Sequence, residues 1–425
     1  MEIAQLYQLF LQYPSVETDT RKLNPGDIFF ALQGPNFNGN QFALQALEAG
    51  AAYVIVSEDV APANDKIIKV EDTLQTLQNL AKYHREQFDI PFIAITGSNG
   101  KTTTKELVHA VLNAHYTTYT TQGNLNNHIG IPLTLLRVKK DAQFAVIEMG
   151  ANHQKEIEGY CKYVKPTHGI ITNVGKAHLE GFGGEEGVRK GKGELFDYIR
   201  ANEGAIFAFD DYTYLHEMSN GIREIHWYGT QNGEVVGTAN LHEYFLSVNM
   251  TKGTAFSTLE TQLVGAYNLP NVLCAIAVGN HFNVPGDKIQ NAIEQYIPTN
   301  SRSQLINRGT NEIILDAYNA NPSSMQAAIE NIAKKESDNK VLIIGGMKEL
   351  GVESEQEHQN LVTLIDKYNW KNVLLVGHEF EPFNKKHEWC ANSEEAKKWF
   401  TDHHFEHSVI LIKGSRGIAL EKVLA

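Results

Sequence analysis

The stretch PFIAITGSNGKTTTKE, residues 91–106, decides the fold class of this chain. Its apolar run at residues 92–95 is typical of a buried strand, and a helical pattern begins at Thr103. Between them, glycines would let backbone N–H groups converge on phosphate oxygens at a helix N-terminus. Gly97 and Gly100 are separated by two residues instead of the four of the general phosphate-loop pattern, so the flanking strand and helix support the interpretation. The stretch predicts a nucleotide-binding α/β domain.

Within this loop, Lys101 is the candidate for holding the β- and γ-phosphates, and the Thr102 hydroxyl is the candidate for binding Mg²⁺. Two further candidates follow apolar runs downstream. Glu148 ends the run at residues 144–147, and His178 comes soon after the run at residues 169–172. Open α/β sheets place ligands at the carboxyl ends of their strands, so both side chains are predicted to lie near the bound cation.

The alternation of apolar runs and helical patterns predicts three α/β domains. Residues 1–88 form a small module with one strand-like run, at residues 52–56, and a long loop. Residues 89–298 form a parallel sheet with further strands at 144–147, 169–172 and 205–208. After a linker at residues 298–303, residues 299–425 form a Rossmann-like doubly wound domain. Its strands at 313–315, 341–344, 373–376 and 409–412 alternate with helical segments near Ser323, Glu355, Ser393 and Arg416.

Composition excludes several classes of protein. The net charge of −13 disfavours a nucleic-acid partner, and no apolar run approaches the ~20 residues needed to span a membrane. The first 16 residues lack the pattern of a secretory signal, which predicts a cytoplasmic protein. The cysteines, Cys161, Cys274 and Cys390, are far apart and suggest neither a disulfide framework nor a zinc site. A monomer is the default expectation.

Taken together, the motifs resemble those of the Mur ligase family along the whole chain. In the first module the resemblance lies in residues 19–32, DTRKLNPGDIFFAL. In the central domain it lies in residues 96–103, in GNLNN at 123–127, in EMG at 148–150 and in AHLE at 177–180. In the last domain it lies in DAYNANP at 316–322 and KGSR at 413–416.

The resemblance implies a role for each matching residue. Lys101, His178 and Lys192 are implied as catalytic, with Lys192 as a lysine that this family carbamylates. A carbamate oxygen could bind Mg²⁺, whereas an ammonium cannot. The implied ATP-binding residues are Gly97, Ser98, Asn99, Gly100, Lys101, Thr102, Thr103, Asn268, Arg302 and Asp316. The implied ligands of two Mg²⁺ ions are Thr102, Glu148, His178 and Lys192. The implied substrate-binding residues are Thr20, Arg21, Asn124, Asn127, Ser415 and Arg416.

The activity that the resemblance implies is ATP-dependent amide ligation in peptidoglycan precursor synthesis. D-alanyl-D-alanine would be joined to UDP-N-acetylmuramoyl-tripeptide through an acyl phosphate. Whether the third residue of the tripeptide is lysine or diaminopimelate stays open. The alternatives are another ligase of the same architecture, such as a folylpolyglutamate synthase, or a phosphate-loop ATPase switch. Three residues depart from the family pattern: Tyr267 replaces a His, Leu315 replaces an acid beside Asp316, and Gly346 replaces another acid.

Overall fold

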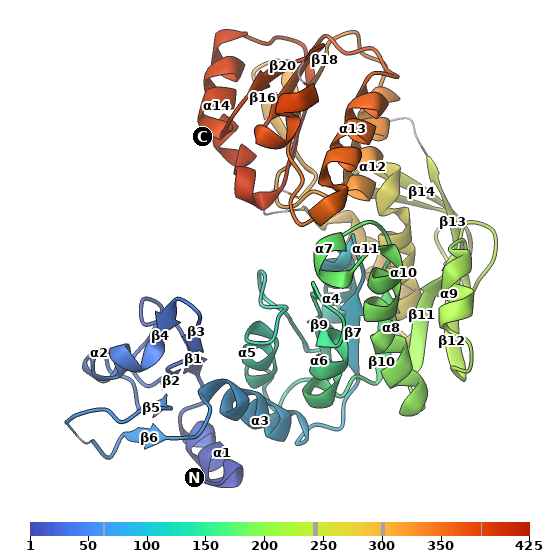
Figure 1. Cartoon of the computed structure of the whole chain (residues 1–425). Coiled ribbons are helices and arrows are strands. Elements are labelled where there is room, and N and C mark those ends of the chain that lie inside the picture. Colours follow the sequence, from blue (N-terminus) through green and yellow to red (C-terminus); the bar gives the residue numbers. More distant parts are fainter. Residues whose placement is uncertain (63, 241–244, 299–301, 384) are drawn as a thin grey trace.

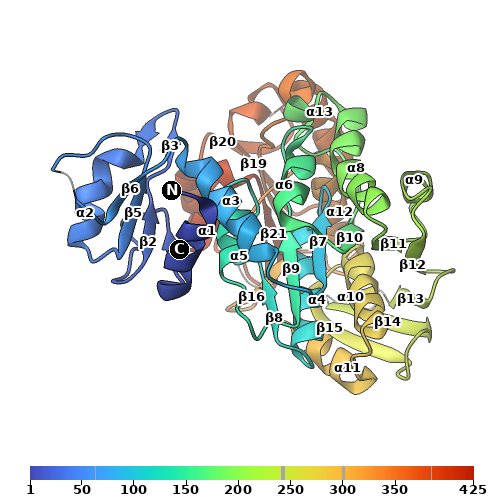
Figure 2. The same cartoon turned by 90° about the horizontal axis from the view of Figure 1, so that it is seen from below.

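The computed structural model describes residues 1–62, 64–240, 245–298, 302–383 and 385–425. The chain forms three α/β bodies in sequence order, coloured blue, cyan to yellow, and orange to red in Figure 1. Figure 2 shows the first body standing to one side of the central one. The predicted fold class is confirmed. The boundaries at 88 and 298 stay predictions, and residues 299–301 of the expected linker lie outside the described residues.

The first body is built on four short parallel strands among the residues described, in the order β1-β2-β5-β6. The prediction of a single strand here was wrong, because strands of two to four residues are too short to show the alternation of apolar and polar residues that predicts a strand. The strands are β1 (Val16–Glu17), β2 (Ile28–Phe30), β5 (Tyr53–Val56) and β6 (Ile67–Lys69), with a small hairpin of β3 (Gln33–Gly34) and β4 (Phe37–Asn38). The helices are α1 (Ile3–Gln12), α2 (Ala43–Glu48) and α3 (Thr73–Arg85).

Helix α3 joins this body to the central one through the buried Arg85. Its guanidinium donates to the carbonyls of Val164 (2.8 Å) and Lys165 (2.9 Å) and lies 3.7 Å above the Phe92 ring. Burial lowers the pKa of Arg85 to about 10. Its charge is therefore held by carbonyl dipoles and an aromatic face instead of a carboxylate.

The central sheet has the order β15-β14-β13-β12-β11-β10-β7-β9-β8 within the residues described. Its strands are β7 (Phe92–Thr96), β8 (Thr118–Thr120), β9 (Phe144–Glu148), β10 (His168–Ile171), β11 (Ala205–Phe209), β12 (Glu224–Gly229), β13 (Val235–Asn240), β14 (Phe245–Lys252) and β15 (Thr258–Val264). Strands β7 to β13 pair in parallel. The predicted parallel sheet and its strands beginning at 92, 144, 169 and 205 are confirmed, whereas β8, β12 and β13 were not predicted. The antiparallel extension through β14 and β15 was not predicted.

The helices of the central body are α4 (Lys101–Asn113), α5 (Gly130–Leu136), α6 (Glu156–Val164), α7 (Leu179–Phe182), α8 (Glu185–Ala201), α9 (Thr213–Met218), α10 (Leu269–His281) and α11 (Gly286–Glu294). Helix α4 starts two residues before the predicted helical pattern, at Lys101, directly after the glycine-rich loop. The loop therefore lies at a helix N-terminus and at the carboxyl end of β7, where a phosphate can be bound.

The last body has the strand order β16-β17-β21-β18-β19-β20 in the described part of the chain, and only β16 pairs antiparallel. Its strands are β16 (Gln304–Arg308), β17 (Asn311–Asp316), β18 (Lys340–Gly345), β19 (Asn372–Val376), β20 (Glu388–Cys390) and β21 (Val409–Lys413). The predicted helices near Ser323, Glu355 and Ser393 are α12 (Pro322–Ala333), α13 (Ser354–Ile365) and α14 (Ser393–Asp402). The helix predicted near Arg416 was wrong: a three-residue 3₁₀ turn, Arg416–Ile418, stands there.

None of the helices formed by the described residues combines the length and the apolar character that a membrane span requires.

Candidate active site

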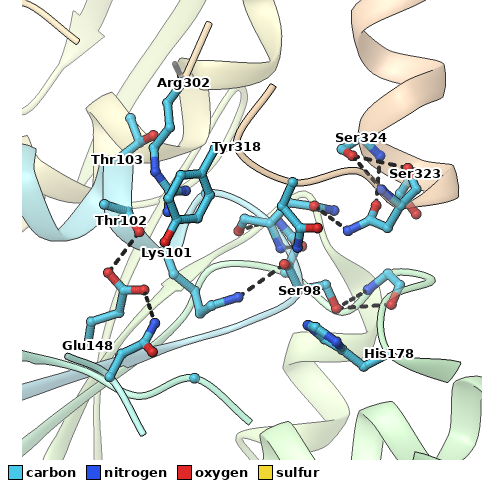
Figure 3. A pocket seen from close by; sticks show the side chains of 18 of the residues that line it. Ser98, Lys101, Thr102, Thr103, Glu148, His178, Arg302, Tyr318, Ser323 and Ser324 are labelled. Atoms are coloured by element: carbon cyan, nitrogen blue, oxygen red, sulfur yellow. Dashed lines mark hydrogen bonds between the residues drawn. The ribbon is translucent and has the colours of Figure 1, made fainter. Parts of the chain in front are cut away.

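A cavity of about 760 Å³ lies between the central body and the last body. The central body contributes the loop after β7, the end of β9 and the segment around His178, and the last body contributes the residues just before β16 and the segment after β17 (Figure 3). The predicted residues that line it are Ser98, Asn99, Gly100, Lys101, Thr102, Thr103, Asn124, Asn127, Glu148, His178, Asn268, Arg302 and Asp316. Most of the candidate residues therefore come together in one place.

The glycine-rich loop has a backbone that requires glycine. Gly97 has φ +140°, and a Cβ there would lie 2.0 Å from the Thr172 hydroxyl oxygen. Gly100 has φ +77° at the N-cap of α4. Lys101 is folded back over the loop, and its Nζ donates to the carbonyls of Gly97 (2.7 Å) and Ser98 (3.1 Å). Burial lowers the pKa of Lys101 to about 8, so a bound polyphosphate would stabilise the charged form of this amine.

Glu148 is held in place by two side-chain donors. The Thr102 hydroxyl donates to Oε2 at 2.8 Å (Figure 3), and Asn126 Nδ2 donates to Oε1 at 2.7 Å. Glu148 is 1% exposed. A hydroxyl and a carboxylate are hard oxygen ligands of the kind that Mg²⁺ prefers, so this pair fits the cation that the sequence predicts. Asn126 was not among the candidates, although it lies in the GNLNN segment that carried the resemblance.

Lys192 is completely buried, although a lysine in a polar stretch would ordinarily lie on the surface. Its Nζ donates to the carbonyl of Ala151 (3.0 Å), a residue that lines the cavity, and lies 4.8 Å from the centre of the Phe182 ring. Burial and repulsion from Lys101 hold the pKa of Lys192 well below its usual value. The amine is therefore shifted toward its neutral form, beside the cavity but not lining it.

His178 lies where the last body contacts the central one. It adopts a left-handed backbone with φ +53°, and its Nδ1 contacts a carboxylate oxygen of Glu349. This hydrogen bond lowers the pKa of Glu349. Nearby, Lys176 Nζ forms an ion pair with Glu357 Oε1 at 2.7 Å, and Asn321 Nδ2 donates to Asn99 Oδ1 at 2.8 Å. Residues predicted to act on ATP thus also form the contact between the two bodies.

On the side of the cavity formed by the last body, Arg302 and Asp316 are each held by neighbouring residues. The Arg302 guanidinium stacks 3.7 Å above the Tyr318 ring. Asp316 accepts hydrogen bonds from Lys413 Nζ (2.6 Å) and the Ser303 N–H (3.2 Å). Tyr318 was missed as a site residue, although it follows Asp316 by two positions in the DAYNANP segment.

The three departures from the family pattern have distinct surroundings. The Tyr267 hydroxyl is 2.8 Å from Ser303 Oγ, and burial raises the pKa of Tyr267. Leu315 is 6% exposed and packs in the core of the last body. A Cβ on Gly346 would lie 2.6 Å from Glu379 Oε2, so Glu379 already occupies the space that a side chain at this position would take.

Other predicted residues lie away from the cavity. Thr20 and Arg21 are in the first body, where Arg21 is bound to Asp19 at 2.7 Å. The Ser415 hydroxyl is buried and donates to the Gly346 carbonyl, and Arg416 lies 5.3 Å from the centre of the Tyr318 ring. Gly97 and Lys192 support the cavity without lining it. A substrate that touches all of these residues would have to extend from the cavity to the first body.

Fold and cavity together define a nucleotide-dependent α/β enzyme of three bodies. Three family models match the chain: "Mur ligase family, catalytic domain" at residues 12–85, "Mur ligase middle domain" at residues 95–279, and "Mur ligase, glutamate ligase domain" at residues 301–416. The chain belongs to the Mur ligase family.

Relatives and solved structures agree with this assignment. The UDP-N-acetylmuramoyl-tripeptide--D-alanyl-D-alanine ligase of Bacillus subtilis is 33% identical over 430 residues, covering 96% of this chain and 92% of the relative. A crystal structure of MurF from Acinetobacter baumannii has a TM-score of 0.88 at 31% identity, covering 96% and 92% of the two chains. The MurF ligase of Thermotoga maritima in complex with ADP has a TM-score of 0.87 at 26% identity, covering 97% of each chain.

Proposed function

We propose that this enzyme is an ATP-dependent ligase that joins D-alanyl-D-alanine to UDP-N-acetylmuramoyl-tripeptide. The observation that carries the proposal is the single cavity that joins the phosphate loop and Glu148 of one body to Arg302 and Asp316 of the next. Relatives named for this activity align with 96% of the chain. The DAYNANP and KGSR segments, which lie in or beside the cavity, favour this acceptor over those of the other ligases of this architecture.

Amide formation from a carboxylate needs activation, because a carboxylate oxygen is a poor leaving group. The terminal carboxylate of the tripeptide would attack the γ-phosphorus of ATP, giving an acyl phosphate and ADP. The free amine of D-alanyl-D-alanine would then attack the acyl carbon, form a tetrahedral intermediate and expel phosphate, with loss of a proton from nitrogen. The first step brings two anions together, so cationic groups must neutralise them.

Several residues of the chain serve that first step. Lys101 would leave the carbonyls of Gly97 and Ser98 and turn its ammonium to the β- and γ-phosphates. Thr102 and Glu148 would hold Mg²⁺, which when bound neutralises phosphate charge. Asn126 would keep Glu148 oriented, since it binds the carboxylate oxygen that Thr102 leaves free.

Lys192 is proposed to be carbamylated. A neutral amine is the form that adds CO₂, and burial of Lys192 favours that form. The carbamate would exchange a positive charge for a negative one beside the cavity and supply an oxygen ligand for a second Mg²⁺. His178 would join the metal sites once it is released from Glu349.

The last body is proposed to exclude water from the acyl phosphate. Arg302 and Asp316 lie on its side of the cavity and would contact ATP when the bodies close on it. Asn268, which accepts a hydrogen bond from Asn271 at 2.9 Å, would face the adenine. Thr20 and Arg21 would bind the UDP-sugar, Asn124 and Asn127 the peptide side of that substrate, and Ser415 and Arg416 the acceptor side.

The test is phosphate release with purified enzyme, ATP and Mg²⁺, together with mass spectrometry of the product. We expect rapid release only when UDP-N-acetylmuramoyl-tripeptide and D-alanyl-D-alanine are both present, and a product heavier by the dipeptide minus water. Tripeptides ending in lysine and in diaminopimelate are run in parallel. Equal phosphate release without either substrate would instead support an ATPase switch, and release that requires a folate together with glutamate would support another ligase.

A further inference from the structure

A group of metal-binding side chains lies at the opposite end of the central sheet from the phosphate loop. Glu224 begins β12, His226 follows it by two residues, and His281 is the last residue of α10. Glu224 is in register with Ala205, the first residue of β11, and the strands from β7 to β12 run parallel. The group therefore lies at the amino ends of these strands, whereas the phosphate loop follows the carboxyl end of β7.

The strand and the helix together bring the three side chains to one place. Glu224 and His226 are two residues apart on a strand, so they project from the same face of the sheet. Helix α10 packs on β11 and β12, and the ring of His281 lies 4.1 Å from the ring of His226, centre to centre. One potential ligand atom from each of the three residues lies within 4.8 Å of the other two.

We infer that Glu224, His226 and His281 form a binding site for a divalent transition-metal ion such as Zn²⁺. Two imidazoles and one carboxylate are established protein ligands of zinc, and they leave a fourth position for water. With bonds of about 2.0–2.2 Å, ligand atoms around a tetrahedral zinc lie about 3.3 Å apart. Glu224 Oε1 and His226 Nε2 are already 3.0 Å apart, so the remaining closure, from at most 4.8 Å, is between His281 and this pair.

Neighbouring groups orient the two histidines for this role. His226 Nε2 is 3.0 Å from a Glu224 oxygen, and Nδ1 is 3.1 Å from Glu234 Oε2. With an ion bound, Nδ1 would donate its proton to Glu234 while the ion would stand between Nε2 and Glu224 in place of a proton. The Phe207 ring stacks on His226 at 5.1 Å and meets the ring of His281 edge-on at 5.5 Å. Both ring planes are thus supported by aromatic packing.

The position of the site determines what the metal does. An ion here would tie the start of β12 to the end of α10 and would touch none of the residues that line the cavity. It would therefore stabilise the central body and leave turnover unchanged, since an ion that binds only the folded state raises the free energy of unfolding. This inference does not depend on the proposed ligase activity.

The test is a titration of the full chain, freed of metals by a chelator, with ZnCl₂ in the presence of excess Mg²⁺. We expect one tightly bound Zn²⁺ per chain, an increase of the thermal midpoint and unchanged phosphate release. His281→Gln and His226→Gln should each weaken zinc binding at least about tenfold, and Glu234→Gln should weaken it by about 10- to 100-fold through the lost support of His226. The control is His216→Gln. His216 stacks on Trp227 and is not one of the proposed ligands, so its replacement should leave zinc binding unchanged.

Equal zinc affinity and stoichiometry in wild type and both histidine variants would overturn the inference, as would a wild type that takes up no zinc. In the latter case the ring nitrogens of His226 merely bridge the two carboxylates. If the histidine variants do not fold, Glu224→Gln replaces them, because that side chain is 57% exposed. Co²⁺ then serves as a second probe: absorption bands of a nitrogen-bound, four-coordinate ion support the site, and the spectrum of the hydrated ion refutes it.

Discussion

Replacing Lys192 by methionine should abolish ligation while leaving the protein folded. Methionine keeps an unbranched side chain in the same buried space and removes the amine that is proposed to carry the carbamate. Lys192→Ala removes the amine as well but empties the space. The pair of variants therefore separates the packing contribution of this residue from its chemistry.

The structure sets the expected magnitudes. Lys192→Met leaves the Ala151 carbonyl without its donor, and an unsatisfied buried acceptor costs about 1–3 kcal/mol of stability. Lys192→Ala also deletes buried methylene groups, for which a loss of about 2–5 kcal/mol is expected. Because the pKa of Lys192 is lowered in the folded state, wild-type stability should rise as pH increases toward the unfolded lysine value of about 10.4. The methionine variant should lack this contribution.

The assays are urea unfolding between neutral and alkaline pH and phosphate release with both substrates saturating. Loss of a charge-stabilising group should lower kcat by about 100- to 1,000-fold in both variants. Acetate should partly restore Lys192→Ala, where it can enter the vacated space, and should not restore Lys192→Met. Turnover of Lys192→Met within about tenfold of wild type, a barrier change of about 1.4 kcal/mol, would refute the carbamate proposal. Native mass spectrometry should show the added mass of CO₂, about 44 Da, in wild type only.

Three further predictions concern nucleotide and acceptor binding. Lys101→Ala should lower kcat by at least about 100-fold with an unchanged unfolding midpoint, while Lys139→Ala, at an exposed position, should match wild type in both measurements. Because the pKa of Lys101 is about 8 in the free enzyme and phosphates favour its charged form, ATP binding at pH 8 should take up about half a proton. Calorimetry in buffers of different ionisation enthalpy measures this uptake, and proton release would contradict the assignment. Arg416→Ala should raise the KM for D-alanyl-D-alanine far more than the KM for ATP. Equal increases of the two KM values would contradict the assignment of Arg416 to the acceptor site.

The strands that the sequence predicted are those whose residues are buried on both faces of the sheet. The runs that became β7, β9, β10 and β11 are continuous and apolar, so their strand character did not depend on tertiary contacts. Strands β14 and β15 alternate between buried and exposed residues and lie at the edge of the sheet, and these were missed. The other short strands of the first body were missed because two or three residues are too few to show the alternation or the apolar run that predicts a strand.

For the candidate site, the sequence predicted the residue types that bind phosphate and metal but not their support. Lys101, Thr102 and Glu148 belong to short motifs with a mechanical reason for each residue, and they meet in the cavity. Asn126 binds Glu148, and Tyr318 stacks under Arg302, through contacts that depend on how separate segments fold together. The burial of Lys192 also follows from tertiary packing, since its local sequence, KGKGE, is polar.

The ion pair of Lys176 with Glu357 and the contact of His178 with Glu349 join the last body to the central one at partly exposed positions. Exposed pairs of this kind each contribute about 0–1 kcal/mol, so together they favour the joined arrangement by a factor of about 30 at most. Because neutral hydrogen bonds such as that of Asn321 to Asn99 also join the bodies, the separated arrangement would be rarer than these two pairs alone would make it. Substrates of very different sizes could enter the same cavity through these separated molecules, and ionic strength, which weakens such pairs, would set how often the entrance opens.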